Sequence, residues 1–209
     1  MRLLNAENLN LKDADVTYYP NFFDKTEADK YFKNLYKEIP WQQDDIKVFG
    51  KTYKQPRLTA FFGENNQSYS YSNITMFPKP FEGHILEIKN TIEGTLNTSF
   101  TSCLANLYRN GKDSNGWHAD NEKELGENPI IASITLGEER VFHFKHKYDK
   151  NLKKKLVLKH GSLLLMQGTT QEYWLHQIPK TSRKISPRIN LTFRIIPQKN
   201  RVPSNSVLS

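Results

Sequence analysis

Hydrophobic residues recur with a helical period at two places in the first half of the chain. Residues 24–39 carry apolar side chains three or four positions apart, which predicts a helix with Asp24 as its N-cap and an end before Pro40. A second helix is predicted over residues 82–93 for the same reason. The apolar positions are Ala28, Tyr31, Phe32, Leu35 and Ile39 in the first helix, and Ile85, Ile88 and Ile92 in the second.

From about residue 101 the apolar pattern shortens to that of β-strands separated by turn signals such as Asn110-Gly111 and His160-Gly161. Many short strands at even spacing are typical of a sandwich, a barrel or a jelly roll, against which both helices are expected to pack. The segment between the helices, residues 41–77, is rich in Tyr, Phe, Gln, Asn and Ser, and we interpret it as hairpins and loops rather than core. The expected strands cover residues 103–109, 130–136, 141–145, 155–158, 162–166 and 189–196.

The composition supports one domain. A chain of 209 residues, 37% of them hydrophobic, is enough for one compact core, and no repeat or Gly/Ser linker divides it. The single cysteine, Cys103, excludes an internal disulfide and the cysteine spacing of a structural zinc site. No apolar run reaches the roughly 18 residues that a membrane span needs. We therefore expect a soluble, unprocessed, monomeric protein of the cytoplasm, or of the nucleus in a eukaryote, with no membrane partner.

The net charge of +8 is concentrated in the last third of the chain. Residues 140–209 hold 15 basic and two acidic residues, which gives +13, whereas residues 1–139 carry a net −5. Most of the basic residues fall in two groups, Lys145–Lys159 and Lys180–Lys184. Such groups fit a phosphate-binding surface, and they also fit a solubilising face whose lysines protect edge strands.

A candidate metal site begins with His118 and Asp120, which lie two residues apart and so share one face of an extended chain. Alone, such a pair is commonly a surface accident. A third candidate ligand, His176, follows beyond the predicted strands, where a closed β fold could return it to His118. Two histidines and one carboxylate leave coordination positions open for a chelating cosubstrate and O2, which favours non-haem Fe(II) over a closed zinc site.

The last predicted strand places two arginines on one face. Arg188 and Arg194 alternate with apolar residues and share their face with Asn190 and Thr192. Two inward-pointing arginines are costly without an anionic partner, and this third of the chain has almost no carboxylates. A bound dicarboxylate fits this requirement, because a guanidinium can make a bidentate contact with a carboxylate.

These motifs together resemble the AlkB-like Fe(II)/2-oxoglutarate-dependent dioxygenases. The likeness covers about residues 22–196 and implies a mainly β fold with flanking helices, in which residues 98–196 form a double-stranded β-helix, or jelly roll. It implies that His118, Asp120 and His176 bind iron. It also implies that Arg194 binds the distal carboxylate of 2-oxoglutarate and that Arg188 lies between the cosubstrate and the iron ligands. Further cosubstrate contacts implied by the resemblance are Asn106, Tyr108 and Thr192.

The reaction implied by the resemblance is oxidative dealkylation. Iron activates O2, 2-oxoglutarate is converted to succinate and CO2, and an N-linked methyl carbon is hydroxylated and leaves as formaldehyde. For a methylated base, the nucleotide must first leave the stack. The expected substrates are 1-methyladenine and 3-methylcytosine in duplex or single-stranded DNA. The alternatives are RNA or a protein side chain as the substrate, or a non-catalytic module that only binds nucleic acid.

Several residues resemble substrate-binding elements of the family, although ordinary strand packing is an alternative for the aromatic ones. Phe49 would wedge into the gap left by a flipped base, as in the hairpin of duplex-repairing members, and Arg57 would lie near phosphate. Glu122 resembles an acidic residue that contacts the base, whereas Asn121 departs from the acid often found there. The expected substrate-binding set is Val48, Phe49, Gly50, Arg57, Tyr69, Tyr71, Ser72, Asn121 and Glu122.

Overall fold

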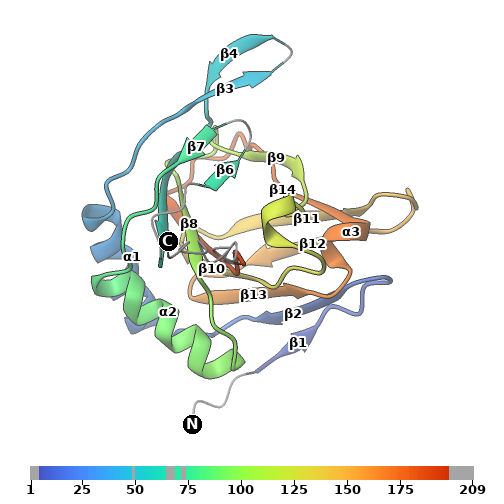
Figure 1. Ribbon diagram of the computed structural model, residues 1–209, viewed down its shortest axis with the longest axis horizontal. Coiled ribbons are helices and arrows are strands. Elements are labelled where there is room, and N and C mark those ends of the chain that lie inside the picture. Colours follow the sequence, from blue (N-terminus) through green and yellow to red (C-terminus); the bar gives the residue numbers. More distant parts are fainter. Residues whose placement is uncertain (1–4, 49, 65–68, 72–73, 198–209) are drawn as a thin grey trace, which may run out of the picture.

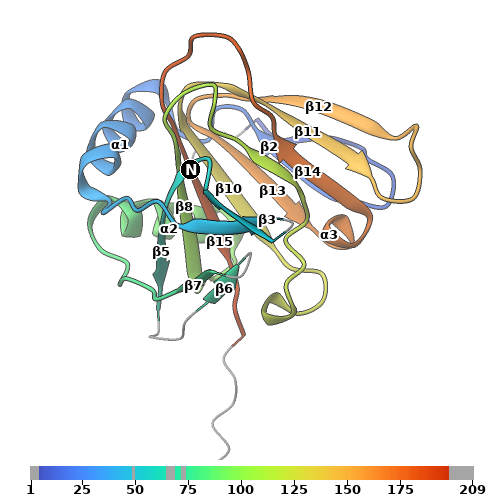
Figure 2. The same ribbon diagram turned by 90° about the horizontal axis from the view of Figure 1, so that it is seen from above.

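Two antiparallel sheets face each other in the computed structural model, and two helices cover the outer face of the larger sheet (Figure 1, Figure 2). The structure describes residues 5–48, 50–64, 69–71 and 74–197. The larger sheet has the strand order β1 (Glu7–Asn8), β2 (Asp15–Tyr19), β13 (Ser162–Gln167), β10 (Ile131–Gly137), β15 (Arg188–Arg194), β8 (Ser102–Tyr108) and β5 (Leu58–Gly63). The smaller sheet has the order β12 (Lys153–Leu158), β11 (Arg140–His146), β14 (Trp174–Ile178) and β9 (Asn115–His118).

Two hairpins, two long helices, one short helix and one 3-10 turn complete the described elements. The hairpin β3–β4 extends away from the sheets at the end where β6–β7 and β9 also lie (Figure 1). The hairpin strands are β3 (Asp45–Val48), β4 (Lys51–Lys54), β6 (Tyr69–Tyr71) and β7 (Ile74–Met76). The helices are α1 (Lys25–Glu38), α2 (Gly83–Leu96) and α3 (Thr170–Tyr173), and residues Lys123–Leu125 form one 3-10 turn. Of the helices described, none is long and apolar enough to cross a membrane.

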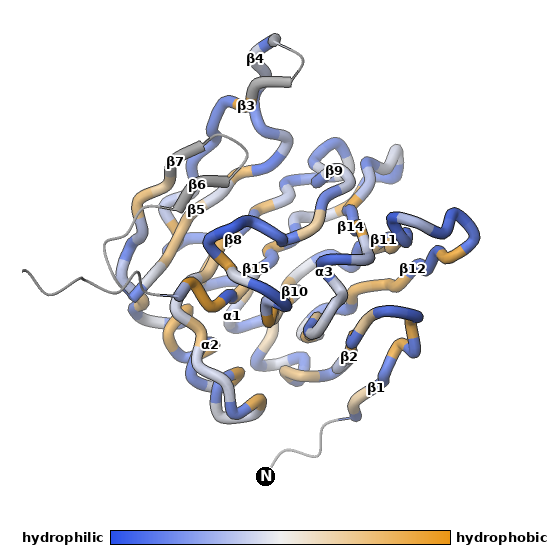
Figure 3. The backbone as a smooth tube through the Cα atoms, turned by 45° about the vertical axis from the view of Figure 1, so that its right-hand side comes forward, coloured by the Kyte–Doolittle hydropathy of each residue, from blue (hydrophilic) through white to orange (hydrophobic). Residues whose placement is uncertain are grey.

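The hydrophobic core has two layers, one on each face of the larger sheet. The outer layer joins α1 and α2 to the sheet through residues such as Leu35, Ile88 and Leu191. The inner layer, between the two sheets, includes Phe144 and Trp174 of the smaller sheet. In the backbone coloured by hydropathy, the loop between β11 and β12 is hydrophilic and lies at the rim of the molecule (Figure 3).

Strand β15 packs into the outer layer with one face and lines a pocket with the other, as its alternating sequence predicts. Ile189, Leu191 and Phe193 belong to the layer under the helices. Arg188 and Arg194 line a pocket between the sheets, together with the polar residues between them. Because successive strand residues point to opposite faces, one strand supplies both packing surface and polar side chains.

The structure confirms the two long helices and corrects three expectations. The interpretation of residues 41–77 as lying outside the core is wrong for β5, whose residues 59–62 are buried. Its pairing with β8 places it at the edge of the larger sheet, although its sequence, with consecutive phenylalanines, lacks the alternation of a half-buried strand. The expected strand list also omits β1, β2, β9 and β14. Helix α2 continues three residues beyond residue 93, and Asn97 follows it in the left-handed region with φ 50°.

Helix α1 begins at a capping box. The Asp24 side chain accepts from the backbone N–H of Glu27 at 2.9 Å, and the Glu27 carboxylate accepts from the N–H of Asp24 at 3.2 Å. These two bonds satisfy donors that the first helical turn otherwise leaves unpaired. The capping box therefore stabilises the helix that covers β10.

Replacing this cap tests its contribution. Asp24→Ala is expected to lower the free energy of unfolding by about 1 kcal/mol, measured by urea denaturation, because it removes one bond and the favourable charge at the helix N-terminus. The neighbouring exposed Lys33→Ala is the control and should change stability by less than about 0.5 kcal/mol. Equal effects of both substitutions would contradict a role for the cap.

Candidate active site

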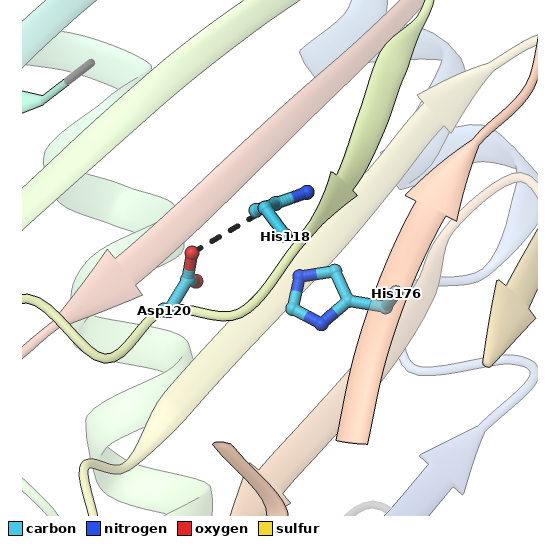
Figure 4. Close-up of side chains that lie close together, drawn as sticks. All are labelled: His118, Asp120 and His176. Atoms are coloured by element: carbon cyan, nitrogen blue, oxygen red, sulfur yellow. Dashed lines mark ion pairs between the residues drawn. The ribbon is translucent and has the colours of Figure 1, made fainter. Parts of the chain in front are cut away.

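Strand pairing brings the three candidate metal ligands together. His118 ends β9, Asp120 follows two residues later, and His176 lies in the middle of β14. The two strands pair antiparallel with His176 directly opposite His118. One ligand atom of each side chain lies within 4.8 Å of those of the other two, and the three side chains point toward one another (Figure 4). The structure thus brings together the three residues expected from the sequence.

Hydrogen bonds around the cluster set the orientation of its side chains. His118 Nδ1 lies 2.7 Å from the carbonyl oxygen of Gly116. Because a carbonyl only accepts, Nδ1 carries the proton and Nε2 keeps its lone pair. The backbone N–H of Asp120 donates to Gln171 Oε1 at 2.9 Å, which holds the residue after β9 in place.

The protonation states of the cluster suit a metal cation. Burial lowers the pKa of His176 to about 3 and also lowers the pKa of His118. Burial alone would raise the pKa of Asp120, but Arg194 and the two histidines lower it to about 2. At neutral pH the site therefore offers two neutral imidazoles and one carboxylate, the forms that bind metal. Asp120 Oδ1 is buried with no hydrogen-bond partner in the described part of the chain, as a ligand oxygen reserved for a cation would be.

The pocket beside the cluster ends at Arg188. This side chain is 1% exposed, its Nη2 donates to Thr135 Oγ1 at 2.8 Å, and its guanidinium lies 5.2 Å from the ring centroid of Tyr108. Within the described residues its Nε and Nη1 have no hydrogen-bond partner. Burial lowers the pKa of Arg188 to about 10. Two unused donors on a buried cation have the chemistry to bind a carboxylate.

The other arginine lies at the metal cluster. Arg194 Nη2 donates to Asp120 Oδ2 at 2.8 Å, and both side chains are buried. Arg188 lies six residues earlier on β15, so the two Cα atoms are about 20 Å apart along the strand, but both side chains line the same pocket. The resemblance placed Arg188 beside the iron ligands, whereas Arg194 is the arginine that contacts one of the candidate ligands. The roles of the two arginines toward a cosubstrate stay predictions. Asp120 is also a protein carboxylate that pairs with one of the two arginines. It was not expected as a partner because it lies outside the last third of the chain.

Polar residues from three neighbouring strands form the wall between the two arginines. Across β15, Asn190 lies opposite Asn106 of β8 and Thr135 of β10. Asn190 Oδ1 accepts from Thr192 Oγ1 at 3.0 Å and from Asn106 Nδ2 at 3.3 Å. The expected residues Asn106, Tyr108 and Thr192 therefore all line the pocket.

Sequence reasoning missed four residues that support the pocket. Ser133 and Thr135 are polar positions two apart in the apolar strand β10, so strand alternation could have identified them. No comparable sequence signal marks Gln171 or Asn115. Gln171 accepts from the backbone N–H of Asp120, and Asn115 Nδ2 lies 3.1 Å from His118 Nε2. Their roles depend on contacts between distant segments.

The expected substrate-binding residues that the structure describes lie outside the pocket lining, on or beside the two hairpins and in the segment after β9. Val48 and Gly50 lie at the turn of the β3–β4 hairpin, and Tyr69 and Tyr71 lie in β6, whereas Phe49 and Ser72 are outside the described residues. Asn121 is exposed just beyond Asp120, and Glu122 is half-buried before the 3-10 turn.

Arg57, which the resemblance places near phosphate, is a buried side chain. It is 4% exposed and donates to Asn106 Oδ1 at 2.8 Å. The side chain is thus used inside the fold, and its contact with a phosphate stays a prediction.

Most of the basic residues of the last third remain at the surface. Lys153, Lys154 and Lys155 are exposed on β12, as are Lys180 and Lys184 in the loop before β15. Lys147 is an exception, since its Nζ donates to the backbone oxygen of Gln171 at 2.9 Å and burial lowers its pKa.

Comparison with known proteins agrees with this site. Residues 15–194 match the model of the 2OG-Fe(II) oxygenase superfamily. The chain is 45% identical to the alpha-ketoglutarate-dependent dioxygenase alkB homolog 3 of Bos taurus, over 87% of this chain and 66% of that protein. It is 35% identical to the DNA oxidative demethylase ALKBH2 of Mus musculus, over 95% of this chain and 85% of that protein. The solved structure of OsALKBH1 has the same fold, with a TM-score of 0.66 at 16% identity, over 91% of this chain and all of that chain.

The fold is a jelly roll, and it holds two histidines and one carboxylate beside a pocket lined by Arg188. This set of ligands is typical of non-haem iron oxygenases. The chain belongs to the 2OG-Fe(II) oxygenase superfamily, and its relatives there are AlkB-like proteins. It spans slightly less than two thirds of the length of the alkB homolog 3 proteins that it matches.

Removing one candidate ligand tests the metal site. His118→Ala is expected to weaken Co(II) binding at least tenfold, measured by the visible absorption of the bound ion, because one of three protein ligands is lost. His143→Ala is the matched control, since His143 lies outside the cluster. Equal Co(II) affinity in the two variants would contradict the assignment of His118.

Proposed function

We propose that this chain is an Fe(II)/2-oxoglutarate-dependent oxidative demethylase that removes N-linked methyl groups from 1-methyladenine and 3-methylcytosine in DNA. The observation that carries the proposal is the buried cluster of His118, Asp120 and His176 beside a pocket that ends at the unused donors of Arg188. A metal cation fits the first feature, and a dicarboxylate cosubstrate fits both.

The described residues divide the binding work between two ends of the pocket. His118, Asp120 and His176 would hold the iron, and Arg188 would take the distal carboxylate of 2-oxoglutarate. Asn106, Tyr108 and Thr192 line the wall along which the cosubstrate would lie. Arg194 orients Asp120 through its Nη2 donor and keeps it ionised.

When bound, iron and 2-oxoglutarate supply an oxidant for a nearby C–H bond, using O2, and release succinate and CO2. The chain's own task is to orient the groups and to exclude alternatives. Phe142, Met166 and Ile178 help to enclose the pocket with apolar side chains. The hydroxylated N-methyl group would then leave as formaldehyde, which restores the base.

DNA as the substrate is supported by the names of the relatives, since the ALKBH2 proteins are called DNA oxidative demethylases. The hairpins β3–β4 and β6–β7, at the end of the molecule where β9 lies, would receive the flipped nucleotide, with Phe49 as the wedge (Figure 1). The exposed lysines of β12 and of the loop before β15 would bind phosphates. We further propose that the protein acts as a monomer in the cytoplasm, or in the nucleus of a eukaryote.

The decisive experiment supplies Fe(II), 2-oxoglutarate and oligonucleotides that carry 1-methyladenine or 3-methylcytosine, and follows the restored base by mass spectrometry. Duplex DNA, single-stranded DNA and RNA of the same sequence are compared. We expect turnover on DNA, and no turnover with Asp120→Ala, because the only carboxylate of the cluster is lost.

Several results would reject the proposal. Full activity of Asp120→Ala would show that the proposed iron site is not needed for the reaction. Turnover on RNA alone would show that RNA, and not DNA, is the substrate. Absence of turnover on DNA and RNA, together with succinate release stimulated by a peptide, would indicate a protein substrate. Nucleic-acid binding without any succinate release would indicate a binding module.

The assignment of Arg188 has its own test. Arg188→Met is expected to raise the KM for 2-oxoglutarate by at least tenfold, because the distal carboxylate loses a charged donor, while Co(II) affinity changes little. With a cosubstrate analogue whose distal carboxylate is replaced by a neutral group, the KM values of Arg188→Met and the unmodified chain should differ less. An unchanged KM for 2-oxoglutarate in Arg188→Met would contradict the assignment.

A further inference from the structure

Strand pairing holds two of the three candidate iron ligands but not the third. His118 and His176 lie opposite each other in the pairing of β9 with β14. Asp120 lies two residues beyond the end of β9, in a bend without strand pairing (Figure 4). A ligand that moves freely before the metal arrives must be ordered on binding, which weakens the site. Other contacts must therefore position Asp120.

The Asp120 carboxylate is positioned by Arg194. This arginine donates to Oδ2 from Nη2 at 2.8 Å and from Nε at 3.2 Å. Within the described residues Oδ1 has no hydrogen-bond partner, so it is the oxygen left for a metal. The contacts with Arg194 set the rotation of the carboxylate, but they do not fix the backbone from which the side chain extends.

That backbone is held by Gln171. Its Oε1 accepts from the backbone N–H of Asp120 at 2.9 Å. The Gln171 side chain is 1% exposed and its Nε2 lies 3.5 Å from Met166 Sδ, which agrees with an amide whose oxygen faces the N–H donor. A protonated backbone amide does not coordinate a metal. The bond therefore takes no donor atom from the cluster, and it can persist when a metal is bound.

The residue that holds Asp120 is also tied to the segment that carries His176. Gln171 lies in α3, and α3 leads directly into β14. The Gln171 backbone oxygen accepts from Lys147 Nζ at 2.9 Å, and Oγ1 of the neighbouring Thr170 accepts from a backbone N–H of β2 at 3.0 Å. Gln171 thus connects the backbone of one candidate ligand with the start of the strand that carries another.

We infer that Gln171 is a positioning residue that sets the place of Asp120 relative to His176 and so prepares the cluster for iron. This inference rests on the proposed function for the identity of the metal, but it does not require that the substrate is DNA. Gln171 does not touch the metal, and it acts through the backbone of Asp120. A purely structural role would change stability alone, whereas a positioning role changes metal affinity.

The test measures the dissociation constant of Co(II), by visible absorption, and the melting temperature of the metal-free chain. Gln171→Leu removes the acceptor, and it is expected to weaken Co(II) binding about tenfold. Gln171→Glu keeps an acceptor oxygen, because a carboxyl group accepts from an N–H in either protonation state, and should bind Co(II) within about threefold of the unmodified chain. Gln177→Leu is the matched control and should change Co(II) affinity less than twofold, since the Gln177 amide lies near His143, outside the cluster.

The comparison of Gln171→Leu with Gln171→Glu separates positioning from general destabilisation. Weak Co(II) binding in the first variant and near-normal binding in the second would support the inference. A lower melting temperature of Gln171→Leu with Co(II) affinity within twofold of the unmodified chain would show a structural role only and overturn it. An equal loss of Co(II) affinity in both variants would overturn it as well, because the restored acceptor would then have no effect.

If Gln171→Leu does not fold, as judged by its melting temperature, Gln171→Asn decides, because this shorter amide keeps the polarity but does not reach the N–H of Asp120. Weakened Co(II) binding in Gln171→Asn supports the inference, and affinity within twofold of the unmodified chain overturns it.

The proposed function fails separately from this inference. An unmodified chain that binds Co(II) but does not act on methylated DNA would reject that substrate and leave the role of Gln171 standing. An unmodified chain that does not bind Co(II) would reject the iron site, and the inference with it.

Discussion

The burial of positive charge is the constraint on which the rest of this structure depends. Arg57, Arg188 and Arg194 lie between or beside the sheets, and Asp120 pairs with Arg194. Isolated buried charges cost several kcal/mol each, so the fold must compensate them with hydrogen bonds or bound ions. Arg194 uses Asp120, and Arg57 uses two asparagines and the backbone oxygen of Ser114. Within the described residues, Nε and Nη1 of Arg188 keep free donors. An anionic ligand that accepts from the free donors of Arg188 would therefore offset the cost of burying this charge.

The scaffold and the site are built from the same strands. In β15, the residues under the helices are packed among aliphatic and aromatic side chains, and the residues between them line the pocket. The rigid outer layer thus limits how far the pocket wall can move. The metal cluster depends instead on the smaller sheet, where β14 and β9 meet at His176 and His118. A ligand that binds both Arg188 and the cluster would connect the two sheets.

Much of the site could be predicted from local sequence because its residues follow strand alternation. The spacing of His118 and Asp120, and the run from Arg188 to Arg194, mark one face of an extended chain. Alternation does not say which of the two arginines contacts Asp120, since it tells which face a residue occupies but not what lies opposite each end. Strand β5 was missed because a fully buried edge strand has no alternation to detect.

The sequence by itself therefore determined the two long helices and the polar face of β15, because these follow from short-range periodicity, and it identified the three candidate iron ligands from their residue types and the spacing of His118 and Asp120. Only the tertiary structure decided that Asp120 neutralises Arg194, that Arg188 keeps its donors free, and that Arg57 serves two asparagines inside the fold. These are contacts between segments up to 74 residues apart, as for Asp120 and Arg194. Such pairings depend on strand register and sheet packing, which periodicity within one segment does not encode.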